Sequence, residues 1–237
     1  MNWFAFEHCL FCHGELKTAA SWRSVFLKTE REYICGGCKN RLEPLKGDTC
    51  RICSKVLEAE FRKGNLCYDC IRWEENPHWS GLLTQNISLY HYNDFLKEII
   101  ARFKYRGDYV LARGFKPDIA SAVKSMLFDC LVPIPLSPER QYERGFNQTE
   151  ALILESGLQP TPLLSRIHTE KQSKKSRTDR IHLSQVFQMI PEKIPDINGK
   201  TILLFDDIYT TGSTLRHAAK ILKENGAGSI YSLTLAR

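Results

Sequence analysis

The sequence predicts an α/β protein in which a doubly wound parallel sheet follows a small amino-terminal metal-binding module. Two observations lead to this fold class. From residue 90 onward, short apolar runs alternate with amphipathic helical segments, the pattern of strands and crossover helices in a parallel sheet. Before residue 71, eight of the nine cysteines form four Cys-x-x-Cys pairs, the pattern of a metal-stabilised module. We therefore expect two domains, residues 1–75 and residues 76–237.

The composition of the 237-residue chain is that of a soluble globular protein, with 43% hydrophobic and 25% charged residues. This mix excludes disordered and collagen-like proteins. No run approaches the roughly 18 apolar residues of a membrane span, and the amino terminus does not resemble a secretory signal, so we expect a cytoplasmic protein. The net charge of +6 is compatible with a polyanionic partner, and most of the basic excess lies in residues 76–237.

The four cysteine pairs are the predicted ligands of two structural zinc ions. A Cys-x-x-Cys turn places two thiolates on one metal ion, and two such turns complete a closed Zn(Cys)4 site. Sequential pairing would build one zinc ribbon from the first two turns and another from the last two; cross-braced pairing is the alternative. The alternative to a metal site is a disulfide framework, which would require an oxidising compartment, and no secretion signal supports one. The eight predicted ligands are Cys9, Cys12, Cys35, Cys38, Cys50, Cys53, Cys67 and Cys70.

The elements of the second domain follow from apolar spacing and from breaker residues. Predicted strands are short apolar runs at residues 130–136, 163–164, 201–205 and 229–236. Predicted helices have apolar residues at helical spacing and lie at residues 90–105, after Pro117, near 149–155 and at 213–225. Residues 71–88 contain Asn-Pro and Gly breakers and predict a connector, and the basic stretch 166–182 predicts a loop. Residues 183–190 are compatible with either a strand or a packed loop.

Residues 201–215, TILLFDDIYTTGSTL, predict a ribose-phosphate site. A buried strand delivers Asp206 and Asp207 at its carboxyl end, and a short polar loop leads directly into a helix. The free N–H groups at a helix start bind phosphate, glycine lets the backbone approach it, and carboxylates accept hydrogen bonds from sugar hydroxyls. The alternative is a capped helix with acids nearby and no ligand. The loop residues are Thr210, Thr211, Gly212, Ser213 and Thr214.

This segment resembles the 5-phosphoribosyl-1-pyrophosphate (PRPP) motif of type I phosphoribosyltransferases. In that motif, four apolar residues precede Asp-Asp, two further apolar positions and Thr-Thr-Gly-x-Thr. The resemblance covers thirteen positions, of which only Tyr209 departs from the usual aliphatic residue. It implies that Asp206 and Asp207 hold the ribose hydroxyls, that residues 210–214 hold the 5′-phosphate, and that Mg²⁺ arrives with the pyrophosphate.

The order of motifs along the whole chain resembles the ComF (ComFC) competence family. Four Cys-x-x-Cys pairs are followed by KYRGD at 104–108, VPIP at 132–135, ERGFNQ at 143–148 and then the Asp-Asp motif. The resemblance implies a double zinc ribbon joined to a parallel-sheet type I phosphoribosyltransferase-like core. It also implies a cytoplasmic role in natural transformation, with single-stranded DNA and a DNA-uptake helicase as expected partners.

Two basic segments supply the remaining candidate contacts, for which a solvated surface is the alternative explanation. In type I enzymes the loop after VPIP binds pyrophosphate, and the stretch at 166–182 corresponds to a loop that closes over PRPP. The pyrophosphate and loop candidates are Arg140, Arg144, Asn147, Gln148, Lys171, Gln172 and Arg177. The nucleic-acid candidates, expected at the rim where strand-end loops converge, are Lys104, Arg106, Lys174, Lys175 and Arg180.

These features lead to one leading functional hypothesis and two alternatives. The leading hypothesis is a cytoplasmic competence protein that binds PRPP and single-stranded DNA during DNA uptake. The alternatives are a phosphoribosyltransferase of nucleotide salvage with an unidentified acceptor and a non-enzymatic zinc-ribbon adaptor for a helicase. No hood segment that would select an acceptor base is identifiable, and no acid follows the Asp-Asp motif where some purine enzymes keep one. The sequence therefore assigns no catalytic residue.

Overall fold

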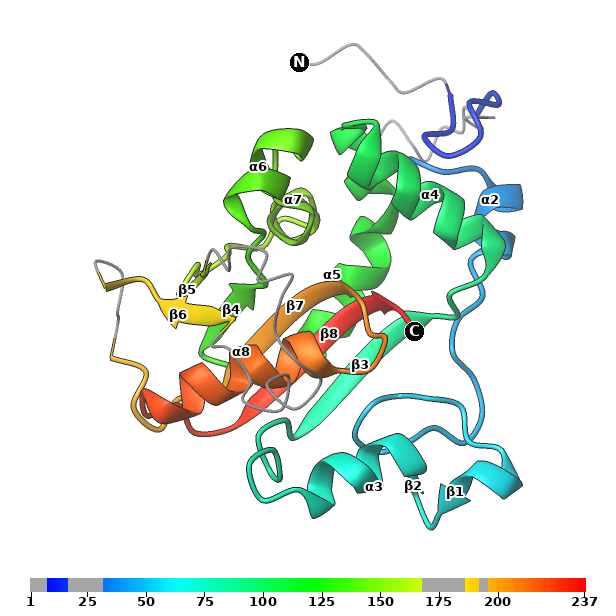
Figure 1. Ribbon diagram of the computed structural model, residues 1–237. Coiled ribbons are helices and arrows are strands. Elements are labelled where there is room, and N and C mark those ends of the chain that lie inside the picture. Colours follow the sequence, from blue (N-terminus) through cyan, green and yellow to red (C-terminus); the bar gives the residue numbers. More distant parts are fainter. Residues whose placement is uncertain (1–7, 17–31, 168–185, 192–195) are drawn as a thin grey trace, which may run out of the picture.

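A four-stranded parallel sheet forms the centre of the computed structural model, which describes residues 8–16, 32–167, 186–191 and 196–237 (Figure 1). The strand order is β3 (Gln85–Tyr90), β8 (Ile230–Ala236), β7 (Ile202–Ile208) and β4 (Cys130–Pro133), and all three pairings are parallel. This arrangement confirms the predicted parallel α/β fold. Among the described helices, none combines the length and the apolar composition needed to cross a membrane.

Helices cover both faces of the sheet. Successive residues of each strand point to opposite faces, so each strand contributes side chains to two cores. In β7, Leu203 and Phe205 belong to one core, whereas Ile202 and Leu204 belong to the other. The first core lies under α4 (Asp94–Tyr105), η2 (Tyr109–Phe115), α5 (Lys116–Lys124) and α7 (Gln148–Glu155). Helix α8 (Ser213–Glu224) covers the second core and lies in front of the sheet in Figure 1.

Strand β3 corrects the prediction that residues 71–88 form a connector. Asn86 and Ser88 are buried polar residues, and their partners lie on the neighbouring strand β8. Ser232 Oγ donates to Asn86 Oδ1 (2.8 Å), and the hydroxyls of Ser88 and Thr234 lie 2.8 Å apart. Since buried polar groups are tolerated when they are hydrogen-bonded, this strand lacks the apolar pattern that would have shown it in the sequence.

Two further segments differ from their predictions, and a third, which the sequence left undecided, is now assigned. The predicted loop at 137–148 contains the short helix α6 (Pro138–Arg144), in which the Ser137 side chain caps the start and Gly145 ends the helix at φ +76°. The segment at 183–190, which the sequence left undecided, contains β6 (Phe187–Met189), paired antiparallel with β5 (Leu164–Arg166). The helix expected over residues 90–105 begins only at Asp94, because Asn93 Oδ1 accepts a hydrogen bond from the Leu96 N–H (2.9 Å).

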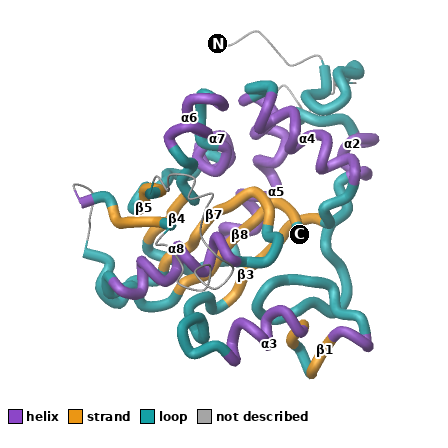
Figure 2. The backbone as a smooth tube through the Cα atoms, in the orientation of Figure 1, coloured by secondary structure: helices purple, strands orange, loops and turns teal. Residues whose placement is uncertain are grey.

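The cysteine pairs lie in two small modules that are separate in space, one beside helix α4 and the other near the strand β3 (Figure 2). The first comprises residues 8–16 and 32–42 with helix α2 (Gly36–Arg41), and its residues Leu10 and Phe11 join the core under α4. The second comprises residues 48–75, and its Ile52 joins the core under α8. The elements of the second module are η1 (Ala59–Phe61), β1 (Arg62–Lys63), β2 (Leu66–Cys67) and α3 (Tyr68–Glu75). The domain boundary between residues 75 and 76 stays a prediction.

The first module docks on α4 and η2 through both backbone and ring contacts. The Arg102 guanidinium of α4 donates to the carbonyl oxygens of Phe11 (2.5 Å) and Leu10 (3.3 Å). The Phe11 ring packs against Phe115, with centroids 5.2 Å apart. Gly114 leaves the space for this contact, since a Cβ atom built there would lie 2.6 Å from the Phe11 ring.

This contact predicts that Gly114→Ala destabilises the protein. The added methyl group must displace the Phe11 ring, so we expect the free energy of unfolding to fall by about 1–3 kcal/mol in urea titrations. Gly36→Ala in α2 is the matched control: its Cβ meets nothing within 4 Å, and alanine favours a helix, so its effect should be neutral or slightly stabilising. Equal free energies of unfolding for the two variants would contradict this docking geometry.

Candidate functional site

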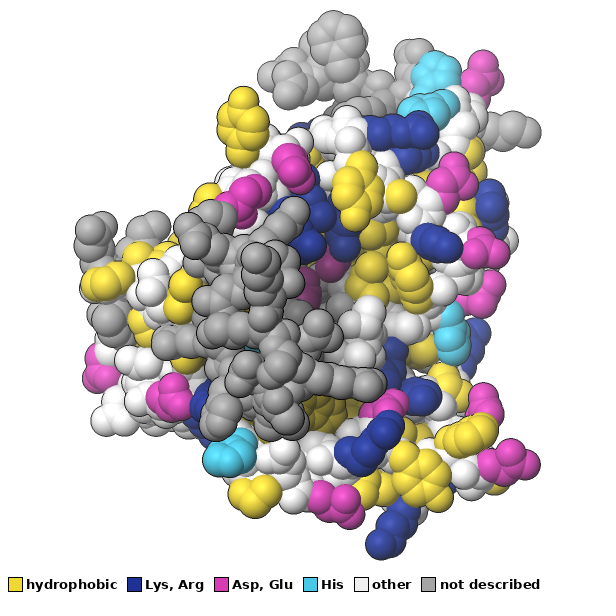
Figure 3. All heavy atoms as spheres, in the orientation of Figure 1, with side chains coloured by type: hydrophobic (Ala, Val, Ile, Leu, Met, Phe, Trp, Pro, Cys, Tyr) yellow, Lys and Arg dark blue, Asp and Glu magenta, His cyan; other side chains and the backbone are white. Residues whose placement is uncertain are grey.

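A cavity of about 230 Å³ opens at the carboxyl ends of β4 and β7, where the predicted site residues converge. In Figure 3, acidic side chains lie at the floor of a hollow, and Lys and Arg side chains lie along its edge. The lining residues are Lys104, Ile134, Pro135, Leu136, Arg140, Arg144, Asn147, Gln148, Thr149, Arg166, Asp206, Asp207, Ile208, Thr210 and Thr214. The cavity thus brings both predicted carboxylates together with parts of the phosphate loop and of the basic loop.

Asp206 and Asp207 lie near the end of β7 and have different surroundings. The Lys104 ammonium of α4 forms an ion pair with Asp207, and only 17% of the Lys104 side chain is exposed. Asp206 Oδ1 accepts a hydrogen bond from the Asp207 backbone N–H (2.9 Å). Burial, followed by the charge of Asp207, raises the pKa of Asp206 well above its usual range. Ligand hydroxyls that donate to Asp206 would stabilise its charged form.

The loop at 210–214 connects β7 to the start of α8. Gly212 is the N-cap of α8 and has a left-handed backbone, with φ +79°. The Ser213 N–H donates to Thr211 Oγ1 (3.3 Å). A Cβ atom on Gly212 would collide with the Tyr209 hydroxyl and would lie 2.5 Å from Arg216 Nη1, so only glycine suits this position. The loop and the first N–H groups of α8 together form an arrangement that can bind a phosphate.

Three arginines line the cavity: Arg140 and Arg144 from α6, and Arg166 from β5. Burial and the charge of Arg140 lower the pKa of Arg166, as expected where like charges lie near one another. Clustered guanidinium groups are suited to bind a phosphate or pyrophosphate. The sequence places Arg166 at the start of the basic stretch 166–182, which is expected to close over PRPP, but does not single it out as a contact.

Asn147 and Gln148, predicted to bind pyrophosphate, make hydrogen bonds within the protein. Asn147 caps α7 by accepting from the Thr149 N–H (3.1 Å), and its amide donates to the Ile134 carbonyl (3.1 Å). Gln148 Oε1 accepts from Arg144 Nη1 (2.6 Å). These amides therefore fix the loop after β4 and orient Arg144 toward the cavity.

The predicted nucleic-acid contacts fall into three places. Lys104, expected at the rim, is held inside the cavity by its ion pair with Asp207. Arg106 is exposed at the carboxyl end of α4. The remaining nucleic-acid and loop candidates lie outside the described residues, namely Lys171, Gln172, Lys174, Lys175, Arg177 and Arg180.

A second cavity, of about 500 Å³, adjoins the first and shares Ile208 and Thr210 with it. Its walls come from the second cysteine module, from the segment after β3 and from the end of β8. The lining residues are Leu45, Lys55, Val56, Glu58, Asp69, His91, Tyr92, Ile208, Tyr209, Thr210 and Arg237. A ligand there would lie beside a ligand in the first cavity.

The eight amino-terminal cysteines form two groups whose sulfur atoms all lie within 4.8 Å of one another in each group. The first group is Cys9, Cys12, Cys35 and Cys38, and the second is Cys50, Cys53, Cys67 and Cys70. Sequential pairing is therefore the arrangement found, and the cross-braced alternative is wrong for these residues.

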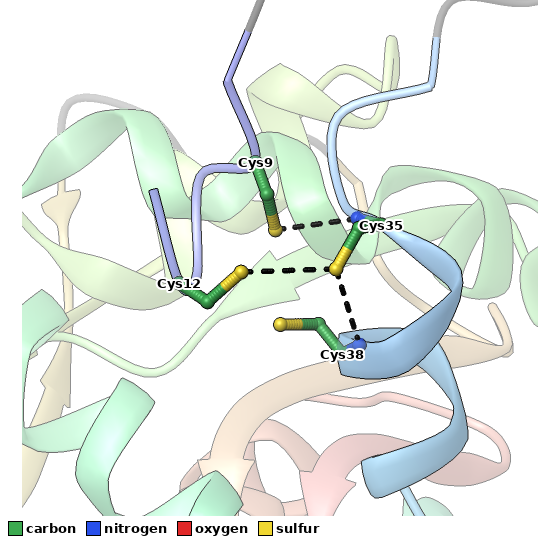
Figure 4. A group of neighbouring side chains, drawn as sticks. All are labelled: Cys9, Cys12, Cys35 and Cys38. Carbon is green, nitrogen blue, oxygen red and sulfur yellow. Dashed lines mark hydrogen bonds between the residues drawn. The ribbon is translucent and has the colours of Figure 1, made fainter. Parts of the chain in front are cut away.

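In the first cysteine group the side chains point toward a common centre (Figure 4). The Cys35 N–H donates to Cys9 Sγ (3.2 Å), and the Cys38 N–H donates to Cys35 Sγ (3.4 Å). Burial acts against the charged form of Cys9, but hydrogen bonds from backbone N–H groups outweigh it and lower the pKa of this thiol. Burial and the neighbouring thiols raise the pKa of Cys38 in the same group, as expected where thiols are packed closely together. Four sulfur donors around one centre are what a tetrahedral metal site requires.

Comparison with known proteins identifies the family. Residues 161–237 match the phosphoribosyl transferase domain model. The chain is 40% identical over 235 residues to competence protein ComFC of Bacillus subtilis. The alignment covers 97% of this chain and 94% of that protein. The chain belongs to the ComFC family of competence proteins. It is also 30% identical over 230 residues to ComFC of Streptococcus pneumoniae, covering 97% of this chain and 99% of that one.

A more distant likeness is to the DNA utilization protein YhgH of Escherichia coli, at 24% identity over 242 residues, in an alignment that covers 86% of this chain and 96% of that protein. The phosphoribosyl transferase match includes Asp206, Asp207, the loop at 210–214 and Arg166. Lys104 and the α6 arginines lie outside the matched range but line the same cavity.

Proposed function

We propose that this ComFC-family protein acts in competence in the cytoplasm by binding PRPP with Mg²⁺ in the first cavity and single-stranded DNA on the rim of that cavity. The observation that carries the proposal is the composition of the cavity, which combines paired carboxylates with residues of the phosphate loop and with a cluster of arginines. PRPP is a ribose that carries a phosphate at one end and a pyrophosphate at the other. Its hydroxyls match the carboxylates of the cavity, and its anionic groups match the phosphate loop and the arginines.

Each part of PRPP has a candidate partner in the cavity. The 5′-phosphate accepts hydrogen bonds from the loop at 210–214 and from the start of α8. The ribose hydroxyls donate to Asp206 and Asp207. The pyrophosphate faces the arginines of α6 and β5. The two carboxylates and the pyrophosphate are hard oxygen donors that suit Mg²⁺, which would neutralise the pyrophosphate charge.

The PRPP proposal predicts that Asp206→Asn combined with Asp207→Asn weakens PRPP binding at least about tenfold in calorimetry with Mg²⁺. A charge-assisted hydrogen bond contributes about 1.5–3 kcal/mol, and the double variant removes the carboxylate acceptors. Asp196→Asn is the control. Asp196 is exposed and precedes the amino-terminal end of β7, far along the strand from the cavity, so this variant should bind PRPP as the wild type does. A wild-type protein that does not bind PRPP would contradict the site, and equal binding by the double variant would contradict these roles.

We also propose that each cysteine group holds one structural zinc ion. Four sulfur donors leave no open coordination position for a substrate, so the metal would stabilise its module rather than take part in chemistry. The first group lies against the core under α4 and the second against the core under α8, so each ion would anchor its module on the sheet.

Elemental analysis of metal-replete protein should find about two zinc ions per chain. Chelation should unfold the amino-terminal modules, because structural zinc contributes about 10–16 kcal/mol to the folding of small modules. Cys130→Ser should leave the zinc content unchanged, since Cys130 belongs to neither group. A zinc content below one ion per chain would refute the assignment.

Exposed aromatic residues next to cavity-lining residues support the DNA part of the proposal. Tyr105 follows Lys104, and Tyr142 lies on α6 between Arg140 and Arg144. Tyr105 and Tyr142 are 76% and 92% exposed, and the Arg144 guanidinium lies 5.3 Å from the centre of the Tyr105 ring. Exposed aromatic rings next to arginines stack the unpaired bases of single strands and contact their phosphates. The names of the relatives, which refer to competence and to DNA utilization, favour a nucleic acid over other polyanions.

Fluorescence anisotropy of a labelled oligonucleotide tests this surface. If about four phosphates are contacted, log affinity should fall with log salt at about −0.7 per contact, near −3 in total. Arg106→Ala should reduce the slope by about 0.7, whereas Tyr142→Ala should weaken binding by about 1–3 kcal/mol at constant slope. Lys97→Ala, an exposed change elsewhere on α4, is the control. Absence of binding at low salt would exclude this function.

Phosphoribosyl transfer is a second candidate function, favoured by the second cavity. Because the two cavities share Ile208 and Thr210, an acceptor in the second would lie next to the sugar of PRPP in the first. Release of pyrophosphate from PRPP that depends on an added acceptor would establish an enzyme. PRPP binding without such release would favour a binding protein. The adaptor role toward a helicase stays a prediction.

A further inference from the structure

Arg216 of α8 is a charged residue with no exposed surface, and no role has yet been given to it. Its Nη1 donates to the Tyr209 hydroxyl (2.8 Å), and its guanidinium lies 4.8 Å from the centre of the Trp73 ring. Glu74 Oε1 is 3.8 Å from Arg216 Nη2. Burying a charge is costly unless partners compensate it. The Tyr209 hydroxyl, the Trp73 ring and the Glu74 carboxylate form one unit around the guanidinium, in which Arg216 Nε and Nη2 make no hydrogen bond among the described residues, so the charge depends on these three neighbours.

This unit touches the phosphate loop at two adjacent residues. The Trp73 indole N–H donates to the Thr211 carbonyl (3.0 Å). The Tyr209 hydroxyl and the Arg216 guanidinium fill the space where a side chain on Gly212 would lie. The loop is therefore held by a hydrogen bond from Trp73 of α3 and by the packing of Tyr209 and Arg216 against Gly212.

Helix α3 connects this unit to the second cysteine group. Cys67 is the N-cap of α3, and Cys70 lies in its first turn. Trp73 and Glu74 follow Cys70 by three and four residues, so the three side chains share one face of the helix. Contacts that hold the cysteine end of α3 in place therefore also hold Trp73 and Glu74, the α3 residues of the unit, in position.

We propose that Trp73, Glu74 and Arg216 are positioning residues that hold the loop at 210–214 in its phosphate-binding conformation, with α3 linking that loop to the second cysteine group. The ligand class is a sugar 5′-phosphate, and this part rests on the proposed function. A loop held in place before binding loses less conformational entropy when the phosphate arrives, which raises affinity without a direct contact.

The test compares Trp73→Phe with Trp79→Phe in the full chain. Phenylalanine at 73 keeps a ring for Arg216 and removes the N–H that reaches Thr211. The control removes an indole nitrogen from the same aromatic cluster, in which the Trp73 and Trp79 rings are 5.4 Å apart. Three quantities are measured for both: hydrogen exchange of the amides at 210–214 without ligand, PRPP affinity with Mg²⁺, and zinc content.

For Trp73→Phe we expect exchange at 210–214 to accelerate about threefold to tenfold and PRPP affinity to fall by a similar factor, the size expected for one lost hydrogen bond. Zinc content should stay at the wild-type value. Trp79→Phe should change loop exchange less, because Trp79 reaches the loop only indirectly, through its packing on His217, whose ring lies 2.8 Å from the Ser213 carbonyl. If loop exchange in the two variants is the same, the positioning role is refuted.

The exchange measurement needs no ligand, so it distinguishes the two proposals. Wild-type protein that binds no PRPP while Trp73→Phe still loosens the loop would refute PRPP binding and leave the positioning role standing. Glu74→Gln supplies a second variant in case Trp73→Phe does not fold, because it removes the negative charge opposite Arg216. It should also accelerate exchange at 210–214, and unchanged exchange would overturn the proposal.

Discussion

The pairing of β7 on both sides is the constraint on which the rest of the molecule depends. Hydrogen bonds to β4 and β8 fix the position of the strand, and its parallel register brings the ends of its neighbours to the same edge. Asp206 and Asp207 can therefore lie beside the loop after β4, although about sixty residues separate the two segments. Loops that follow parallel strands converge at this edge, which is why ligands of such sheets bind there.

The pairing of charged side chains then determines which groups at this edge of the sheet are available to a ligand. Asp207 is buried and paired with Lys104 from α4, while Asp206 is partly exposed and makes no ion pair among the described residues. The arginines of α6 and β5 place positive charge around the same cavity. The cavity therefore contains carboxylate acceptors as well as guanidinium donors, and of the two carboxylates Asp207 already has its charge paired by Lys104.

The amino-terminal modules are integrated with this site more closely than a separate domain would be. The first packs Phe11 beneath α4, the helix that also provides Lys104. The second contacts the phosphate loop through Trp73 and lines the cavity next to it. Helix α4 thus packs against the first module and lines the cavity at the sheet edge, and helix α3 carries both Cys70 and Trp73, which gives the modules a physical connection to the cavity.

The sequence by itself determined the features that depend on local spacing: the cysteine pairs, the strand–acid–loop–helix order at 201–215 and the alternation typical of a parallel sheet. It missed β3, because Asn86 and Ser88 are buried by hydrogen bonds to a strand almost 150 residues away. It also left open the pairing of the cysteines and gave no site role to Arg166 or Arg216. Only the tertiary structure decided these points, since each depends on which distant groups compensate a buried charge, thiol or polar side chain.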